Sequence, residues 1–459
     1  MKFTKLSLIA TLAISTAVAG ADIAQEPIPE PVAEVSPWSF GGDVKFFYST
    51  TDSENIDLFD QEASIGQAAV SADISYSFAT TWKANFGITG IATLGLDDSV
   101  VGGVWLYAGA DASDGSLEFT SVGDALWVDT ANITGTAFDG KATFILGRTE
   151  LDTPFAFTET WNIANNTFDA AVATVNPIDN LTLVAAYIYD GNGNGERITT
   201  MGGGFTGDDG YFPVAGVEEG AWSVAAIGKF DTVTAQVWYY DVVDIAQAIW
   251  AQVDANFDGF AIGGQYAYMD PSDLGDALGS DLSDYESSAF AAKISYEKDA
   301  FSLWAAYSSV DEAGLIAISN TATMLSGAGW GGASGYPAGQ SKLYTEAWWN
   351  YGFVGLPGAE TFAVAGSYKV NDSLNLTAQY TSVSDAMNTL LTILAPDEVD
   401  ATTMDMSELT LLAETSYYGV DLAFAYTYSD YTTYANDADL AAEGTFDNNT
   451  LQAYITYKF

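Results

Sequence analysis

The residues that could do chemistry in this chain are almost all carboxylates. The 459 residues include 61 Asp and Glu against 13 Lys and Arg, a formal net charge of −48, and they include neither His nor Cys. Thiol nucleophiles, Cys-ligated metal centres, serine triads and HExxH metalloproteases are therefore excluded. The acidic excess also argues against nucleic acid as a partner, because proteins that bind it need a basic patch. We expect no enzyme, but a protein whose side chains attract, repel or coordinate ions.

One group of carboxylates lies in an unusually apolar stretch. Residues 150–167 begin with Glu150 and carry Asp152 and Glu159 among large apolar side chains such as Phe155, Phe157, Trp161 and Ile163; Arg148 lies just before them. A loop of this composition is not expected to project into solvent. It either folds into the interior of the protein and narrows it, or packs on a rim. In the first case the carboxylates, Glu150 included, would select ions. Arg148 would then be the counter-charge at the base of the loop.

A second acidic segment partly matches a calcium-binding loop. Asp190, Asn192 and Asn194 fit the first half of the pattern, but Met201 stands at the twelfth position, where a bidentate Glu is required. A solvated turn explains the same residues. Acidic side chains also crowd residues 269–287, where divalent cations could bind weakly, although a charged exposed loop needs no such ligand. We expect no cofactor and no firm metal site.

The elements that must position these side chains are β-strands. Segments of about ten residues alternate large apolar side chains with small or polar ones, most clearly in residues 449–459. A period of two indicates a strand with two unlike faces. After the N-terminal region, no apolar run is long enough for a membrane-spanning helix. The expected strands lie near residues 40–48, 68–78, 82–91, 122–133, 141–149, 168–175, 181–189, 221–229, 232–240, 247–255, 258–268, 288–297, 300–308, 359–369, 373–383, 407–417, 418–428 and 449–459.

The connections between these strands alternate in length. Some are turns of two or three residues, and the others are long and acidic or Gly-rich, such as 190–220 and 309–358. This alternation, with aromatic side chains at the ends of the apolar faces, is typical of a transmembrane antiparallel β-barrel and not of a soluble β-sandwich. We expect an all-β fold of about 18 strands (16–20) around a water-filled lumen. Residues 92–121 fit least well, since 101–110 could form an extra strand or part of a loop.

The N-terminal residues are expected to lie outside the barrel. Residues 1–21 have a basic start, an apolar run and small residues, which predicts a signal peptide for Sec-dependent export; a retained anchor helix is the alternative. Residues 22–37 are acidic and hold four Pro, which predicts an extended periplasmic tether. The barrel would then occupy residues 38–459.

Strand parity puts a further set of charged and polar side chains on the inner face. A row of Lys opposite the acidic loop 150–167 would create a transverse field that orients dipolar solutes. Alternatively, these Lys pair with neighbouring Asp and only keep the wall hydrated. Because the chain is so acidic, we expect a channel that prefers cations. The side chains expected in the lumen are Lys45, Lys83, Lys293, Lys369, Lys458, Asp43, Asp73, Asp421, Gln236 and Gln265.

Three segments carry a family resemblance. Residues 146–155, 165–171 and 181–187 resemble the major outer-membrane porins of epsilonproteobacteria, which are related to OprD-like porins. The resemblance implies an 18-stranded barrel, a homotrimer, and a third loop that lines the constriction. It also implies a place in the bacterial outer membrane, among lipid and lipopolysaccharide. OprD-like relatives use a ladder of Arg for their substrates, but this chain has only Arg148 and Arg197, so that specificity is not carried over.

The last strand ends in aromatic residues. The terminal aromatic residues, Tyr457 and Phe459, resemble the signal read by the barrel-assembly machinery. The first function we expect is a passive diffusion channel for ions and small hydrophilic solutes. The alternative is a structural or adhesive surface-layer protein that uses its acidic extracellular loops.

Overall fold

The fold was examined in a computed structural model of the chain. It describes residues 36–52, 56–92, 110–111, 118–119, 125–160, 163–192, 212–213, 220–273, 282–320, 339–387, 402–435 and 444–459. The expected signal peptide, most of the tether, residues 101–109 and Asn194 lie outside these ranges. Within the described part, no helix is long and apolar enough to span a membrane.

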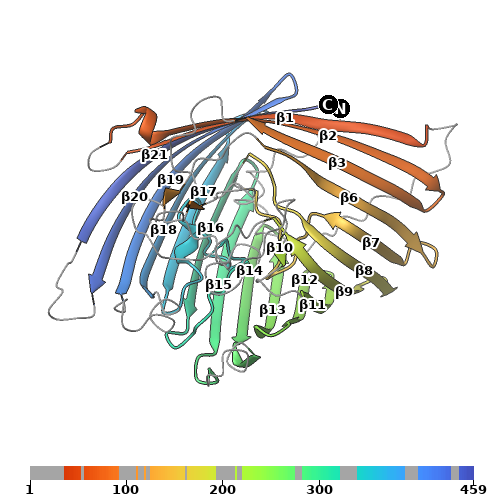
Figure 1. Cartoon of the computed structure of the whole chain (residues 1–459). Helices are drawn as coiled ribbons and strands as arrows, with labels where there is room; N and C mark the ends of the chain where they lie inside the picture. Colours follow the sequence, from red (N-terminus) through yellow and green to blue (C-terminus); the bar gives the residue numbers. More distant parts are fainter. Residues whose placement is uncertain are drawn as a thin grey trace.

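Eighteen long strands form one closed antiparallel barrel, so the fold prediction is confirmed. Figure 1 follows them around the ring in chain order. Two-residue strands add β10 (Phe212–Pro213) beside β9, and β4 (Ala110–Asp111) pairs with β5 (Glu118–Phe119) in a separate small sheet. The eighteen are β1 (Trp38–Thr51), β2 (Ser64–Ala79), β3 (Trp82–Ala92), β6 (Ala125–Ala137), β7 (Ala142–Thr149), β8 (Phe168–Ile178), β9 (Leu181–Gly191), β11 (Ala221–Phe230), β12 (Val233–Val242), β13 (Ala246–Phe257), β14 (Phe260–Asp270), β15 (Ser287–Lys298), β16 (Phe301–Val310), β17 (Glu360–Lys369), β18 (Leu374–Met387), β19 (Thr402–Tyr417), β20 (Val420–Ala435) and β21 (Gly444–Lys458).

The barrel closes where β1 pairs with β21. The register runs from Asp43 opposite Lys458 to Thr51 opposite Thr450. The backbone N–H of Phe459 donates a 3.0 Å hydrogen bond to the carbonyl of Gly42. A Cβ atom on Gly42 would lie 2.8 Å from the Phe459 ring, so this ring covers a position that only glycine leaves open.

Tight turns join the strands at one end of the barrel. In the β13–β14 turn, Asp258 and Gly259 have φ angles of 44° and 89°, and Phe257 is paired with Phe260. Two successive positive φ angles define a type I′ turn, whose twist matches that of the flanking strands. Asp and Gly tolerate this conformation better than most residues, so the local sequence sets the hairpin register.

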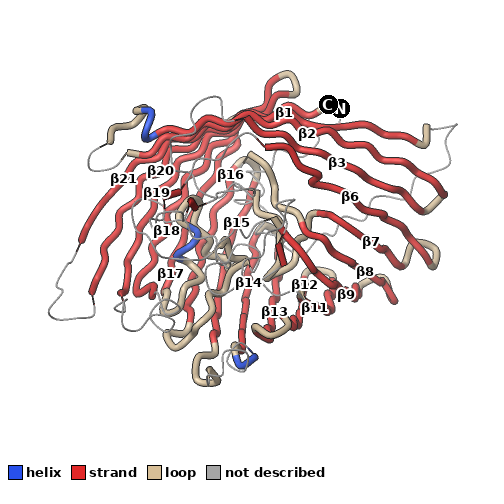
Figure 2. The backbone as a smooth tube through the Cα atoms, viewed as in Figure 1, coloured by secondary structure: helices blue, strands red, loops and turns tan. Residues whose placement is uncertain are grey.

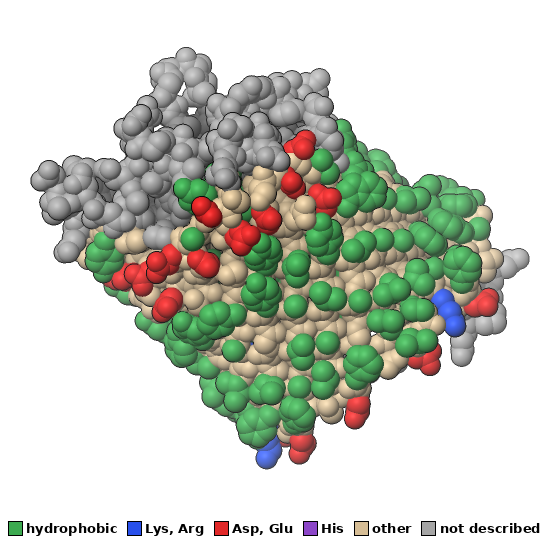
Figure 3. All heavy atoms as spheres, turned by 90° about the horizontal axis from the view of Figure 1, so that it is seen from below, with side chains coloured by type: hydrophobic (Ala, Val, Ile, Leu, Met, Phe, Trp, Pro, Cys, Tyr) green, Lys and Arg blue, Asp and Glu red, His purple; other side chains and the backbone are tan. Residues whose placement is uncertain are grey.

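The outer surface of the strands is apolar. On β12, the outward-facing Val237 and Tyr239 are 50% and 40% exposed. The residues that alternate with them, Gln236, Trp238 and Tyr240, face inward and are buried. Figure 3 shows hydrophobic side chains spread over the strand surface, with the charged side chains gathered toward its borders. A barrel exterior of this kind is suited to the hydrocarbon core of a membrane, because in water a continuous apolar band would be exposed.

The interior of the barrel holds a hydrophobic core. Most of its buried residues come from the inward faces of strands between β8 and β20 and from two connections, residues 150–167 (the third loop) and the described residues of 311–359; Leu282 adds a contact from the β14–β15 connection. Figure 2 shows loop segments inside the ring of strands. The connection 309–358 was expected only as a long external loop. We define residues 339–359, which lead into β17, as the inner segment; the aromatic side chains of this segment explain why it is buried instead.

Candidate functional site in the barrel interior

The third loop folds back on itself as a tight hairpin. Thr158 N–H donates to the Leu151 carbonyl at 2.7 Å, and Thr153 N–H donates to the Ala156 carbonyl at 3.2 Å. The Thr153 hydroxyl also donates to the Ala156 carbonyl, at 2.7 Å. Pro154 stands at the second position of this four-residue turn, where its fixed φ favours reversal. The sequence therefore shapes the tip of the loop locally.

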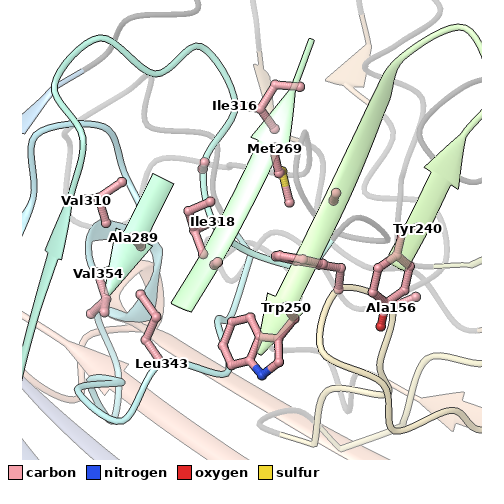
Figure 4. Packing of buried hydrophobic residues seen from close by; sticks show 14 of the residues in the cluster. Ala156, Tyr240, Trp250, Met269, Ala289, Val310, Ile316, Ile318, Leu343 and Val354 are labelled. Atoms are coloured by element: carbon pink, nitrogen blue, oxygen red, sulfur yellow. The ribbon is translucent and has the colours of Figure 1, made fainter. Parts of the chain in front are cut away.

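Phe155 anchors the loop tip to the strands. Its side chain is 1% exposed, and its ring packs edge-on against Tyr240 and Trp250, with centroids 5.3 and 5.6 Å away. Both partners lie on the buried faces of β12 and β13. Figure 4 shows Ala156 beside Tyr240, close to Trp250. Edge-to-face contacts add to the burial of these large rings, so the loop is fixed by packing as well as by hydrogen bonds.

Asp152 is the carboxylate of this loop that faces water. Its side chain is 57% exposed, and its Oδ1 forms an ion pair with Lys342 Nζ at 2.7 Å. The Lys342 ammonium also lies 4.3 Å from the centroid of the Phe157 ring. Glu150 is exposed as well and accepts a 2.7 Å hydrogen bond from Asn165 Nδ2. The counter-charge of Asp152 thus comes from the inner segment, a partner that the sequence did not predict.

Glu159 occupies a different environment from Asp152. It is 1% exposed, and its Oε1 accepts hydrogen bonds from Asn320 Nδ2 at 2.9 Å and from the Gln340 N–H at 3.2 Å. The Glu159 N–H donates to Asn166 Oδ1 at 2.6 Å. Glu159 therefore joins the third loop to the connection that follows β16, and its carboxylate is shielded from the open lumen.

Arg148 binds the wall of the barrel. Its Nε and Nη2 donate to the two carboxylate oxygens of Asp169, each at 2.9 Å, and Nη1 donates to the Val128 carbonyl at 2.9 Å. A bidentate pair of this kind fixes orientation as well as charge. Arg148 on β7 thus ties β8 and β6 together at the base of the third loop.

One side of the interior keeps charged side chains within reach of water. On β1, Lys45 Nζ lies 3.5 Å from Asp43, with side chains 15% and 18% exposed. Asp73 on β2 is exposed and Lys83 on β3 is partly exposed. We call the part of the inward faces of β1–β3 and β6–β7 that carries these charged side chains the open wall. Further along the same strands, Phe47 and Trp127 are buried against Trp349 and Tyr351 of the inner segment.

The opposite side is covered by the inner segment. Lys293 on β15 is 7% exposed, with its Nζ 4.8 Å from the Trp304 ring and 5.8 Å from the Tyr344 ring. Gln265 Nε2 donates to the Lys342 carbonyl at 2.8 Å, and its Oε1 accepts the Tyr344 N–H at 3.0 Å. We call the inward faces of β12–β19 the covered wall. Lys293 and Gln265 thus support the inner segment.

The remaining residues expected in the lumen are distributed differently. Gln236 is buried and its Oε1 accepts a 2.8 Å hydrogen bond from Trp238 Nε1. Lys369 is exposed at the end of β17, 3.7 Å from Asp372 in the following turn. Asp421 is partly exposed and Lys458 is exposed near the same end of the barrel. The alternation of residues along a strand predicted which side chains face inward. It did not predict how far each one lies from the end of the barrel.

Asp129 is a lumen residue that sequence reasoning missed. A Cβ atom on Gly87 would lie 2.5 Å from Asp129 Oδ1 and 2.6 Å from Asp73 Oδ1, so these two carboxylates are close neighbours. The β3–β6 register shifts between Gly87 and Ile88, which leaves Asp129 as the extra residue of a bulge. A bulge breaks the period of two, and alternation alone therefore cannot place Asp129.

The inner segment was missed for a different reason. Glu408 on β19 is 1% exposed and accepts the N–H groups of Trp348, Trp349 and Asn350 at 2.8–3.2 Å. Asn350 Nδ2 donates to the same carboxylate at 2.8 Å. Residues 344–353 contain five aromatic side chains. The aromatic criterion that singled out residues 150–167 would have singled out this segment too.

The calcium-loop match is partly described by the structure. Asn192 is 1% exposed, and its Oδ1 accepts the Thr167 N–H at 2.8 Å, which holds the end of the third loop. Asp190 lies on β9, where it pairs with Asp169 in the β8–β9 ladder. Among the described residues, no three acidic side chains are grouped as a metal site.

Comparison with known proteins supports the fold. No family model and no curated protein matches the sequence. Among solved structures, the chain is similar to OccAB4 of Acinetobacter baumannii, with 13% identity, a TM-score of 0.62, and coverage of 93% of this chain and 99% of that one. It is also similar to OpdK of Pseudomonas aeruginosa solved with vanillate, with 11% identity, a TM-score of 0.63, and coverage of 92% of this chain and 99% of that one. For OccD3 of the same organism the identity is 14%, the TM-score is 0.60, and the coverage is 93% of this chain and 92% of that one. These are OprD/Occ-family porins, and at such low identity the likeness shows a common fold.

Proposed function

We propose that the chain is a porin of the bacterial outer membrane, a passive diffusion channel that prefers cations among ions and small hydrophilic solutes. The observation that carries this proposal is the contrast between an apolar exterior and an interior wall with water-accessible charges, in a closed barrel of 18 strands. A barrel of this size leaves room for an aqueous path. Its fold likeness to OprD/Occ porins supports the same function. Its sequence resemblance favours kinship with the epsilonproteobacterial major porins.

The constriction in this proposal lies between the open wall and the two inward-folded connections. The third loop contributes the exposed carboxylates of Asp152 and Glu150. The open wall contributes Asp73 and Asp129, whose carboxylates lie together beside Gly87. Two unit charges about 4 Å apart interact by roughly 4 kcal/mol at an effective dielectric constant of 20, so a cation passing between these carboxylates is favoured even after partial screening.

The proposal is tested by conductance in planar bilayers. The purified protein should insert in discrete current steps, and a KCl gradient should give a zero-current potential of the sign expected for cation passage. Replacing Asp73 and Asp129 together by Asn should move that potential toward neutrality. Asp299→Asn, in the turn between β15 and β16, is the control for a charge distant from the constriction. Absence of current steps would favour the surface-layer alternative, and preference for chloride would reverse the proposed polarity.

Assembly is a separate part of the proposal. We infer a homotrimer inserted by the barrel-assembly machinery, on the strength of the family resemblance and of the aromatic C-terminus. The Phe459 N–H pairs with Gly42 and its ring lies over that residue, so deletion of Phe459 should remove a contact of the closing strand pair. We expect surface levels of the protein to fall sharply, measured by heat-modifiable mobility of outer-membrane fractions. Normal levels would contradict the role of Phe459, and a native mass of one chain would contradict the trimer.

A further inference from the structure

Lys342 is the only basic residue of the inner segment. Its Nζ lies 2.7 Å from Asp152 Oδ1 of the third loop and 4.3 Å from the centroid of the Phe157 ring. The side chains of Lys342 and Asp152 are 36% and 57% exposed, so water and dissolved solutes reach the pair. This ammonium group is accessible, in contrast to the buried one of Lys293.

The third loop supplies both of the groups that contact this ammonium. Asp152 and Phe157 stand opposite each other as a β-bridge in the loop hairpin. The Phe157 N–H donates to Asn320 Oδ1 at 3.2 Å, and the Phe157 carbonyl accepts a hydrogen bond from Asn320 Nδ2 at 2.8 Å. The carboxylate and the ring are therefore held together by backbone contacts that do not involve Lys342. We call the Asp152 carboxylate and the Phe157 ring the ammonium site.

The chemistry of the ammonium site suits an alkylammonium group. A carboxylate attracts the positive charge and accepts an N–H hydrogen bond, and the face of an aromatic ring attracts the same cation. Phe157 is 2% exposed while Lys342 lies over its ring. Because Lys342 itself borders water, shortening its side chain opens this ring face and the Asp152 carboxylate to the lumen together. A small cation can then take the place of the Lys342 ammonium.

Lys342 reaches the ammonium site from a backbone that is fixed to the covered wall. Gln265 Nε2 donates to the Lys342 carbonyl at 2.8 Å, and Gln265 Oε1 accepts the Tyr344 N–H at 3.0 Å. A group that is held close to a site by its own chain competes with dissolved ligands as if it were present at high concentration. A dissolved ammonium ion therefore meets a matching site that is already filled.

We propose that the ammonium site binds the primary ammonium groups of solutes and that Lys342 occupies it as a built-in competitor. While Lys342 is bound, it neutralises Asp152, a carboxylate on the proposed ion path, and so limits the cation preference of the channel. A solute that takes the site displaces the Lys342 ammonium. The inference rests on the proposed channel function, because ions and solutes reach the site through the lumen.

The first measurement is the zero-current potential in a KCl gradient. Lys342→Ala removes the competitor and leaves Asp152 charged, so the ratio of K⁺ to Cl⁻ permeability should rise roughly fivefold, the factor for two unit charges about 4 Å apart in water. Lys369→Ala is the matched control, because Lys369 also pairs with an aspartate, Asp372 at 3.7 Å, but in a turn at the end of the barrel. The control should keep the wild-type ratio.

The second measurement is the block of the K⁺ current by ethylammonium in symmetrical KCl. In Lys342→Ala the added cation should bind the empty site and reduce the current saturably. The wild type should need about tenfold more ethylammonium for the same block, because Lys342 competes for the site. In Lys342→Ala/Asp152→Asn only the linear decrease expected from bulk solution should remain, since the charge that holds the ammonium is gone.

The outcomes separate the two proposals. A protein that gives no K⁺ current contradicts the proposed channel. If the protein conducts but Lys342→Ala has the wild-type permeability ratio, the role of Lys342 is overturned. Equal block by ethylammonium in Lys342→Ala and in the double variant overturns the binding site. If Lys342→Ala fails to insert, Lys342→Met, which keeps the length of the side chain, decides the question through the permeability ratio.

Discussion

The open wall and the covered wall arise from the same strand pattern but serve different ends. On the covered wall, Glu408 accepts three consecutive backbone N–H groups of the inner segment, and Tyr344 donates to Asp254 at 2.6 Å. On the open wall, Asp73 and Asp129 face each other, and Lys45 and Asp43 remain accessible. Inward polar side chains thus build a scaffold where a protein segment satisfies them, and the wall of the proposed solute path where they stay accessible to water.

The largest effect should follow from removing the acceptor on the covered wall. In Glu408→Ala, the N–H groups of Trp348, Trp349 and Asn350 would be buried without a partner, at about 1–3 kcal/mol each. The inner segment should therefore undock, which should lower the thermal unfolding temperature and raise the single-channel current. Glu408→Gln retains an acceptor oxygen and is expected to keep most of the docking. If Glu408→Ala has the wild-type current, the covered wall does not depend on this carboxylate.

A smaller and sharper contrast should separate the two carboxylates of the third loop. Asp152→Asn should move the zero-current potential toward neutrality at little cost in stability, because an exposed ion pair contributes about 0–1 kcal/mol. Glu159→Ala should do the reverse. It should lower stability by about 1–3 kcal/mol, because the Asn320 amide and the Gln340 N–H would lose their acceptor, while changing the potential less. The two measurements together are the check. Equal shifts of the potential would show that burial does not divide their roles.

The smallest effect should be a pH dependence of the covered wall. Burial, strengthened by the nearby Glu159 carboxylate, raises the pKa of Glu346 well above its ordinary value of 4.5. The folded chain then binds a proton that the unfolded chain releases, so stability is greatest below pH 4.5 and falls as the pH rises through the folded pKa. The slope is at most about 1.4 kcal/mol per pH unit.

Glu346→Gln tests this dependence directly. Thermal unfolding measured across the acidic and neutral range should give a flatter pH profile in the variant than in the wild type. Ser341, whose N–H donates to Glu346 at 3.1 Å, can still find an acceptor in Gln. A profile of unchanged slope would assign the pH dependence to other carboxylates.

The strands were predictable because their chemistry is periodic. Alternation located all eighteen, and most of the errors were at the ends, where strands such as β19 and β20 extend several residues beyond the expected bounds. The third loop was predictable as a distinct segment because of its aromatic side chains. What the pattern lacks is distance between strands, so it could not pair Arg148 with Asp169 or Asp152 with Lys342.

The remaining differences have local causes. The bulge at Asp129 interrupts alternation, and no feature of residues 125–137 announces it. The cluster of Phe47 and Trp127 with Trp349 and Tyr351 brings together residues that are far apart in sequence. Such features follow from how the segments meet in space, and a single sequence without distances does not contain them.

The placement of the hydrophobic core inside the barrel has a consequence for motion. Residues 339–359 are held by side-chain contacts and capped backbone groups, whereas each strand is held by two ladders. The inner segment is therefore a cooperative unit of its own, able to open while the ladders stay intact. Its amide protons would exchange with solvent through local openings on a faster timescale than those of the strands. In the proposed channel, fluctuations of the ion current would then follow the lifetime of this one segment, with the barrel wall unchanged.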